Sequence, residues 1–208
     1  VAIYWEGENG ETRALSYSTL YRDVNRFASV LQKLGVKKGD KVALYMPMIP
    51  ELPTFMLACA RIGAVHTVIF SGFSSQAVCD RVNDTQAKIL ITADGGYRRG
   101  KIIPLKEIAD QAAPRCPSIE KVIVVKRTGQ KIAWNERDVW LTDLLDKDTE
   151  YYVKPESVDS THPLYILYTS GTTGKPKGIV HSTGGYLVFN HSAYQWVFNL
   201  REDSVFWC

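Results

Sequence analysis

Short segments that are apolar at nearly every position alternate along this chain with amphipathic segments of helical period. Between Ser16 and Gly35, apolar residues recur at steps of three and four residues, which predicts an amphipathic helix that ends at the glycine. The following run, from Lys41 to Met46, is short and apolar on both of its alternating faces. A strand with two apolar faces has to be covered on both sides, so it is typical of a buried parallel sheet.

The same alternation continues to residue 126. Strands of this kind, joined by helical crossovers, favour an α/β fold: a doubly wound, mostly parallel sheet with flanking helices. Ligands of such folds bind beyond the carboxyl ends of the strands, so a site is expected in the loops that follow them. We expect further helices at residues 51–62, after Ser74-Ser75 and at residues 105–113, and further strands at residues 65–70, 88–92 and 121–126.

The pattern weakens beyond residue 126 into a polar stretch, in which one short helix is expected at residues 139–145. We therefore expect a first α/β subdomain portion at residues 1–150 and the start of the next subdomain at residues 151–208. The chain begins with valine rather than methionine, and it ends in an apolar stretch typical of a strand cut short. Both ends lead us to expect a fragment of a longer protein.

Composition argues against several classes of function. The formal net charge is +3, from 25 basic and 22 acidic residues, which is too small to predict nucleic-acid or membrane binding by bulk attraction. No apolar run reaches the roughly 18 to 20 residues that span a bilayer, and no signal-peptide pattern is present, so we expect a cytoplasmic protein. The four cysteines form no CxxC pair and the four histidines no HExxH motif, so we expect no metal site within this chain.

Residues 164–181 contain the most informative loop of the sequence. An apolar strand leads into small hydroxyl residues, glycines and two lysines, and a second apolar segment follows. Glycines let the backbone approach a polyphosphate closely, while hydroxyl groups and lysines supply hydrogen-bond donors and positive charge. We expect a polyphosphate to bind to Thr169, Ser170, Gly171, Thr172, Thr173, Gly174, Lys175 and Lys177.

Two other interpretations of this loop fit less well. A Walker P-loop has four residues between its glycines and a serine or threonine after its lysine, whereas here two residues separate Gly171 from Gly174, and Pro176 follows the lysine. A flexible surface linker would also be rich in glycine and threonine. Four hydroxyl residues, three glycines and two lysines within ten residues favour phosphate binding over a linker.

The segment from Tyr168 to Gly178, YTSGTTGKPKG, resembles the signature of the adenylate-forming superfamily, which includes acyl-CoA synthetases, luciferases and peptide-synthetase adenylation domains. Three further segments are similar to acetyl-CoA and propionyl-CoA synthetases in particular. They are YMPMIPE at residues 45–51, ACARIGA at residues 58–64 and FSGFS at residues 70–74. The resemblance covers essentially the whole chain.

This resemblance implies ATP-dependent activation of a short-chain carboxylic acid, with acetate preferred, through an acyl-adenylate to an acyl-CoA, with release of AMP and pyrophosphate. It implies that residues 169–177 bind the β- and γ-phosphates of ATP and stabilise the departing pyrophosphate. The ligands of Mg²⁺, the acyl pocket and the catalytic lysine of a C-terminal domain are expected outside these residues. We therefore assign no catalytic residue here and expect the fragment alone to be inactive.

A second cluster of charge follows the predicted strand at residues 88–92. From charge alone, a solvated turn is the simpler interpretation of these residues. The position beyond a strand and the resemblance together imply that the cluster binds the phosphates of CoA. The implied CoA-binding residues are Arg98, Arg99, Gly100 and Lys101. Family members often have arginine at the position of Lys101. Lysine keeps the positive charge of that arginine but lacks its planar guanidinium fork. The resemblance supports CoA binding by Arg99 less strongly than by Arg98 and Lys101.

Two other functions fit the same features. Another adenylate-forming enzyme, such as a propionate or medium-chain acyl-CoA ligase or an adenylation domain, would share the phosphate loop. A non-catalytic module that binds ATP or CoA would need the loop and the basic cluster, but none of the chemistry. Since the acyl pocket is expected outside this chain, the preference for acetate rests on overall resemblance alone. The expected partners are small molecules: a short-chain carboxylate, ATP and CoA.

Overall fold

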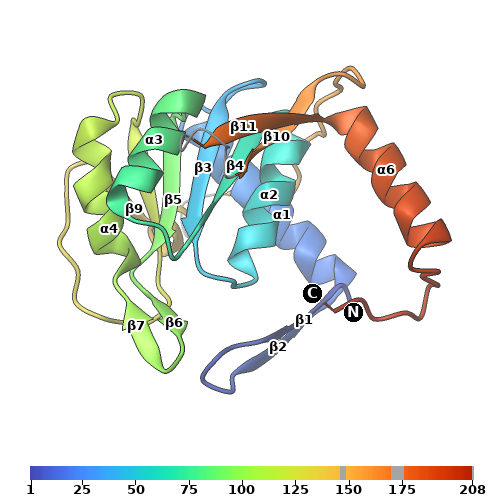
Figure 1. Ribbon diagram of the computed structural model, residues 1–208, viewed down its shortest axis with the longest axis horizontal. Coiled ribbons are helices and arrows are strands. Elements are labelled where there is room, and N and C mark those ends of the chain that lie inside the picture. The colour runs from blue at the N-terminus through green and yellow to red at the C-terminus, as the bar shows by residue number, and fades with distance from the viewer. Residues whose placement is uncertain (146–148, 170–175, 208) are drawn as a thin grey trace.

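The central element of the protein is a mostly parallel sheet. The computed structural model describes residues 1–145, 149–169 and 176–207. Within these residues the sheet has seven strands in the spatial order β11-β10-β4-β3-β5-β8-β9, and all neighbours are parallel except β10 and β11 (Figure 1). The strands are β3 (Lys41–Met46), β4 (Val65–Phe70), β5 (Ile89–Ala93), β8 (Lys121–Val125), β9 (Asp138–Trp140), β10 (Pro163–Thr169) and β11 (Lys177–Ser182).

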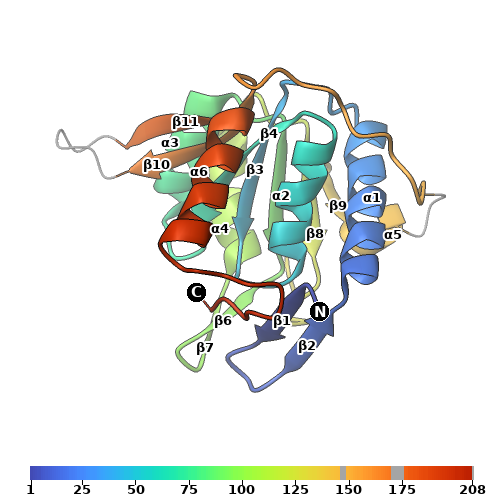
Figure 2. The ribbon, with the colours of Figure 1, turned by 90° about the vertical axis from the view of Figure 1, so that its right-hand side faces the viewer.

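Helices pack on both faces of this sheet, which confirms the doubly wound α/β arrangement expected from the sequence. On one face α1 packs against α2, and on the other α3 packs against α4 (Figures 1 and 2). α5 contacts α1, whereas α6 lies on the side of α1 and α2 and buries none of its residues. The helices are α1 (Tyr17–Lys33), α2 (Glu51–Arg61), α3 (Ser75–Thr85), α4 (Leu105–Ala112) with the 3-10 turn η1 (Ala113–Arg115), α5 (Leu141–Leu145) and α6 (Thr183–Trp196). Among the described residues, no helix has the length and apolar character needed to cross a membrane.

Two short antiparallel hairpins lie near the edge at which β3, β4 and β5 end (Figures 1 and 2). In the first, β1 (Ile3–Glu6) pairs with β2 (Thr12–Leu15), and in the second, β6 (Gly96–Arg98) pairs with β7 (Lys101–Ile103). Neither hairpin was expected from the sequence. Strands of three or four residues offer too few positions for a periodic pattern to be recognised.

Local sequence explains where the main helices begin and end. Ser16 caps α1 by accepting a hydrogen bond from the backbone N–H of Thr19 at 3.0 Å, and Ser74 caps α3 by accepting one from Ala77 at 3.4 Å. Gln86 ends α3 in the left-handed conformation, with φ of 54°. The two serine caps place the start of each helix where the sequence predicts it.

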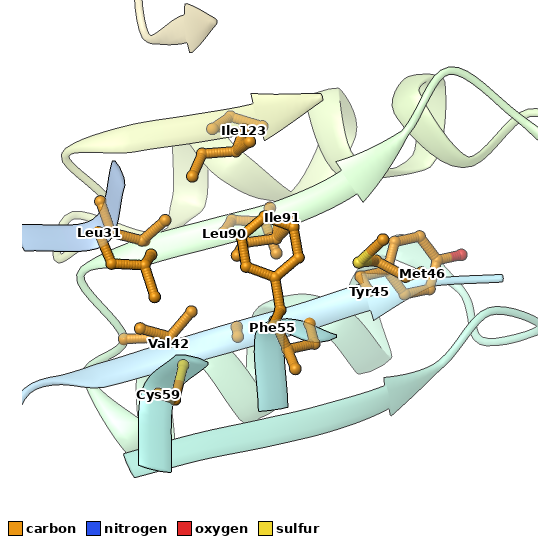
Figure 3. Close-up of a cluster of buried hydrophobic side chains, with 14 of the residues drawn as sticks. Leu31, Val42, Tyr45, Met46, Phe55, Cys59, Leu90, Ile91 and Ile123 are labelled. Atoms are coloured by element: carbon orange, nitrogen blue, oxygen red, sulfur yellow. The ribbon is translucent and has the colours of Figure 1, made fainter. Parts of the chain in front are cut away.

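The core lies on both faces of the sheet, under α1 and α2 on one side and under α3 and α4 on the other. Phe55 of α2 is fully buried, and its ring centroid lies 4.4 Å from that of Phe27 in α1. Figure 3 shows Phe55 and Leu31 directed toward the side chains of β3 and β5. Every residue of β3 from Val42 to Met46 is buried, so this strand is covered on both faces, as a central parallel strand must be.

Two details differ from the sequence prediction. The helix expected at residues 139–145 begins only at Leu141, because the preceding residues form β9 and pair in parallel with β8. Those residues include valine and tryptophan, which suit a strand, and this preference explains the error. The apolar stretch at residues 203–207 forms no strand within the described part of the chain.

The sheet continues across the subdomain boundary predicted at residue 150. β10 joins it through one residue pair, Tyr165 with His66, and β11 then pairs with β10 along its length. The division into residues 1–150 and 151–208 stays a prediction.

We predict that Phe55→Ala lowers the free energy of unfolding by about 3–5 kcal/mol, because it removes a buried ring and leaves a cavity between two helices and the sheet. Urea unfolding followed by circular dichroism measures this loss. Leu57→Ala is the matched control on the same helix, since Leu57 is 45% exposed and its truncation should cost about 0.5 kcal/mol or less. Equal losses in the two variants would contradict this placement of the core.

A second prediction concerns acid stability and the buried His66 of β4. Its side chain stacks on Tyr165 with ring centroids 5.5 Å apart, and burial lowers the pKa of His66 to about 4, from an ordinary value of 6.5. The unfolded chain therefore binds a proton more readily than the folded chain, so stability is lost as the pH falls from about 6.5 to about 4.

We predict that the free energy of unfolding falls by about 2–3 kcal/mol more in the wild type than in His66→Phe between about pH 7 and pH 4.5. Phenylalanine keeps a ring against Tyr165 but does not titrate. Urea unfolding of both proteins across this pH range measures the difference. Parallel pH profiles would show that protonation of His66 is not coupled to folding.

Candidate functional site

The carboxyl ends of the central strands and the two hairpins enclose a cavity of about 220 Å³. Parallel strands bring the loops that follow them to one edge of the sheet, which is where doubly wound folds bind ligands. The cavity is lined by the loops that follow β3 and β4, by both hairpins and by Arg127 in the loop after β8. Its lining includes Trp5, Met48, Phe70, Tyr97, Arg98 and Arg127.

The turn of the β6–β7 hairpin explains the placement of the four predicted CoA-binding residues. Its two central residues both have positive φ, 51° at Arg99 and 71° at Gly100, as the type I′ turn of two-residue hairpins requires. This turn makes Arg98 and Lys101 partners across the hairpin. The structure therefore brings these two cations together, while Arg99 and Gly100 form the bend between them.

Arg98 lies at the cavity with its charge available to a ligand. Its guanidinium carbon is 4.7 Å from the centre of the Phe70 ring at the end of β4. Gly72 leaves space for this approach, because a Cβ on that residue would collide with the guanidinium of Arg98. Within the part of the chain that the structure describes, Arg98 forms no ion pair with a carboxylate. Lys101 is exposed on the other strand of the hairpin.

Arg127 is a cavity residue that the sequence analysis missed. Its guanidinium lies 4.9 Å from the Tyr97 ring and 5.2 Å from the Trp5 ring, and it forms an ion pair of 2.6 Å with Glu11. It thereby connects the two hairpins across the cavity. Its position just beyond β8 could have pointed to it, because doubly wound folds bind ligands in the loops that follow the strands, and the cluster after β5 was singled out on that basis.

The phosphate-loop residues Ser170, Gly171, Thr172, Thr173, Gly174 and Lys175 lie outside the described residues. The two ends of the loop are described. Thr169 ends β10 and Lys177 begins β11, and these two exposed residues are partners in the antiparallel pairing. The hairpin therefore holds the first and last of the predicted phosphate-binding residues side by side.

The ends of this loop lie beside α3, which contacts the end of β10 through Asp84 and Arg81. The hydroxyl of Tyr168 donates a hydrogen bond to Asp84 near the end of α3, and its ring lies 5.3 Å from the guanidinium carbon of Arg81. Burial and the hydrogen bond to Asp84 raise the pKa of Tyr168, so this hydroxyl stays protonated at neutral pH. Tyr168 thus fixes the strand at the point where the loop begins.

Among the described residues, the two ends of the phosphate loop lie apart from the β6–β7 hairpin. In both views the adjoining ends of β10 and β11 lie in the upper part beside α3, whereas the β6–β7 hairpin lies at the bottom (Figures 1 and 2). Among the described residues there is also no group of three or more histidine, cysteine, aspartate or glutamate side chains that could hold a metal ion. Basic side chains from the two predicted sites therefore stand at two separate places, Arg98 and Lys101 on the β6–β7 hairpin and Lys177 at the start of β11.

Comparisons with known proteins extend over the whole chain. The sequence profile of the AMP-binding enzyme family matches residues 1–208. The acetyl-coenzyme A synthetase of Rubrobacter xylanophilus is 56% identical over 209 residues, and that of Deinococcus radiodurans is 53% identical over 209 residues. Each comparison covers 100% of this chain and 32% of the relative. The solved structure of acetoacetyl-CoA synthetase from Streptomyces lividans has a TM-score of 0.86 and 31% identity, over 95% of this chain and 30% of that one.

The chain spans about a third of the length of the curated relatives that it matches. The family profile nevertheless matches this chain along its full length, residues 1–208. The chain belongs to the AMP-binding enzyme family.

Proposed function

We propose that the protein containing this chain is an acetate–CoA ligase that uses ATP and forms AMP. The observation that carries the proposal is the identity of 51–56% to acetyl-coenzyme A synthetases over the entire chain, phosphate loop included. In the first step, the acetate carboxylate attacks the α-phosphorus of ATP, which forms acetyl-adenylate and releases pyrophosphate. In the second, the CoA thiol attacks the acyl carbon, which forms acetyl-CoA and releases AMP.

The first step needs positive charge near the leaving pyrophosphate, and the phosphate loop would supply it. Charge builds up on the oxygens of the β- and γ-phosphates as the bond to the α-phosphorus breaks. Lys177 and Thr169 stand at the base of the loop with their side chains exposed, so both are accessible to a nucleotide. Fixed donors and cations stabilise such charge without any covalent role. We propose this role for residues 169–175 and Lys177.

The second step requires a place for CoA, and we propose the β6–β7 hairpin. The guanidinium of Arg98 offers a planar fork to a phosphate, and the ammonium of Lys101 adds a second charge across the same hairpin. Arg99 and Gly100 would contribute the turn and its backbone. Since ATP would bind at the β10–β11 loop, these residues would affect the second step and not the first.

Magnesium is expected with ATP, but the described residues do not favour a site for Mg²⁺ here. Magnesium prefers carboxylate oxygens and water, and no group of three or more histidine, cysteine, aspartate or glutamate side chains that could hold a metal ion is present in the described ranges. We therefore propose that its ligands lie in another part of the protein. A cytoplasmic location and the absence of nucleic-acid partners remain proposals that rest on the net charge of +3 and on the sequence pattern.

We predict that the longest reading frame containing this chain catalyses acetate-dependent exchange of labelled pyrophosphate into ATP, and that Lys177→Ala lowers the exchange rate about a hundredfold. The loss follows from removing one cation that stabilises the departing pyrophosphate. Exchange measured with acetate, propionate, butyrate and acetoacetate ranks the acids, and we expect acetate to be fastest.

Lys121→Ala is the matched control for this experiment. Lys121 is likewise an exposed lysine at the first position of a strand, β8, but lies away from the loop. It should retain the wild-type rate within about twofold. A folded protein that binds ATP yet exchanges pyrophosphate with none of the four acids would favour a non-catalytic binding module, and faster exchange with another acid would favour a different acyl ligase.

For CoA, we predict that Arg98→Ala raises the KM for CoA about tenfold and leaves the exchange rate unchanged, since it removes one charge-assisted contact to a phosphate. Steady-state thioester formation at varied CoA concentration measures this KM. Arg98→Lys keeps the charge and should recover part of the loss. An unchanged KM in Arg98→Ala would place CoA elsewhere.

A further inference from the structure

Asp94 is a buried carboxylate that directly follows β5, and its exposed fraction is 1%. Its Oδ1 accepts hydrogen bonds from the backbone N–H groups of Gly95 at 2.8 Å, Arg127 at 2.7 Å and Thr128 at 2.9 Å. Its Oδ2 accepts one from the N–H of Gly129 at 2.7 Å. The carboxylate is therefore surrounded by backbone donors of the loop that follows β8.

The backbone of Asp94 is tied to the same loop. Its N–H donates to the carbonyl oxygen of Val125 at 2.9 Å, and its carbonyl oxygen accepts from Nε2 of Gln130 at 2.5 Å. In the described ranges no lysine or arginine side chain forms an ion pair with Asp94. A buried carboxylate that is satisfied by backbone donors alone holds those donors in a fixed arrangement, because each hydrogen bond lost would leave a charged group short of a partner.

Both hairpins at the cavity depend on the segment that Asp94 holds. The β6–β7 hairpin begins two residues after Asp94, and its first residue, Gly96, packs so closely on Pro47 that a Cβ would lie 3.0 Å from the Cβ of that proline. From the loop, the side chain of Arg127 reaches Tyr97 on this hairpin and Trp5 on the β1–β2 hairpin. Asp94 thus fixes the base of one hairpin and the backbone of the arginine that joins the two.

We propose that Asp94 is a positioning residue for CoA, which holds the β6–β7 hairpin so that Arg98 and Lys101 meet the phosphates of this substrate. The inference rests on the proposed function. The hairpin has only three residues in each strand, so the direction of Arg98 is set mainly at its base. Asp94 does not touch the ligand, and its effect passes through the loop after β8 and the hairpin.

The test is Asp94→Asn in the longest reading frame that contains this chain. Asparagine keeps one acceptor oxygen and places an NH₂ group among backbone donors, so the base of the hairpin loosens while the volume is preserved. We expect the KM for CoA to rise about tenfold or more, as for other misplacements of a binding group, while acetate-dependent pyrophosphate exchange stays within about twofold of wild type. A residue with only a structural role would lower both activities together.

Two further variants make the result specific. Asp40→Asn is the matched control, because Asp40 also accepts a backbone N–H, that of Lys37 at 2.8 Å, but precedes β3 at the opposite edge of the sheet. It should leave the KM for CoA unchanged. Gly95→Ala keeps the carboxylate of Asp94 but places a Cβ 2.7 Å from Nε2 of Gln130 and 2.8 Å from Oγ1 of Thr128. It should raise the KM for CoA in the same direction, even if Asp94→Asn fails to fold.

Calorimetric titration with CoA separates this inference from the proposed function. Wild-type protein that exchanges pyrophosphate, with CoA affinity that is unaffected by Asp94→Asn and Gly95→Ala, would overturn the inference alone. Wild-type protein without exchange, but with CoA affinity that falls about tenfold in these variants, would contradict the ligase proposal and support the inference. Equal losses of exchange and CoA affinity in both variants, or the absence of CoA binding by the wild type, would also overturn the inference.

Discussion

The arrangement of the whole structure depends on the burial of β3 and β5 on both faces. Each strand is buried along nearly its full length, so helices have to pack on both sides of the sheet. Helical crossovers on both sides make β4, β3, β5 and β8 parallel, and parallel strands end at one edge. That edge carries the loops that enclose the cavity, so the location of the candidate CoA site follows from the apolar character of the strands beneath it.

Much of this fold could be predicted because its signals are local. The strands expected at residues 41–46 and 65–70 match β3 and β4 in their bounds, and the caps at Ser16 and Ser74 mark the helix starts. What the sequence could not reveal depends on contacts between distant residues. Lys106 lies on an amphipathic helix yet is fully buried, with its Nζ 2.5 Å from Asp110 and 2.8 Å from Asp138. The i, i+4 spacing is compatible with the pair to Asp110, but no pattern of spacing predicts the pair to Asp138.

The candidate site, like the fold, could be predicted from the sequence only in part. The composition of the loop after β10 and the family resemblance of the cluster after β5 predict two sets of phosphate-binding residues, and the structure places Arg98 and Lys101 of the second set together on one hairpin. The position of Arg127 just beyond β8 could have been noticed, but its contacts and those of Asp94 could not be predicted, because they require β5 and β8 to be neighbours and the loops that follow them to be in contact. The contact of β10 with α3 could not be predicted either, because Tyr168 and Asp84 are far apart in the sequence.

The central claim is that acetate attacks the α-phosphorus of ATP in the protein that contains this chain. Mass spectrometry of the AMP formed from ATP, CoA and acetate labelled with ¹⁸O in its carboxylate tests this claim most directly. Attack by the carboxylate leaves one acetate oxygen on the α-phosphorus when CoA displaces AMP, so the account predicts one ¹⁸O atom in each AMP. Unlabelled AMP, or ¹⁸O found in phosphate or pyrophosphate instead, would contradict it.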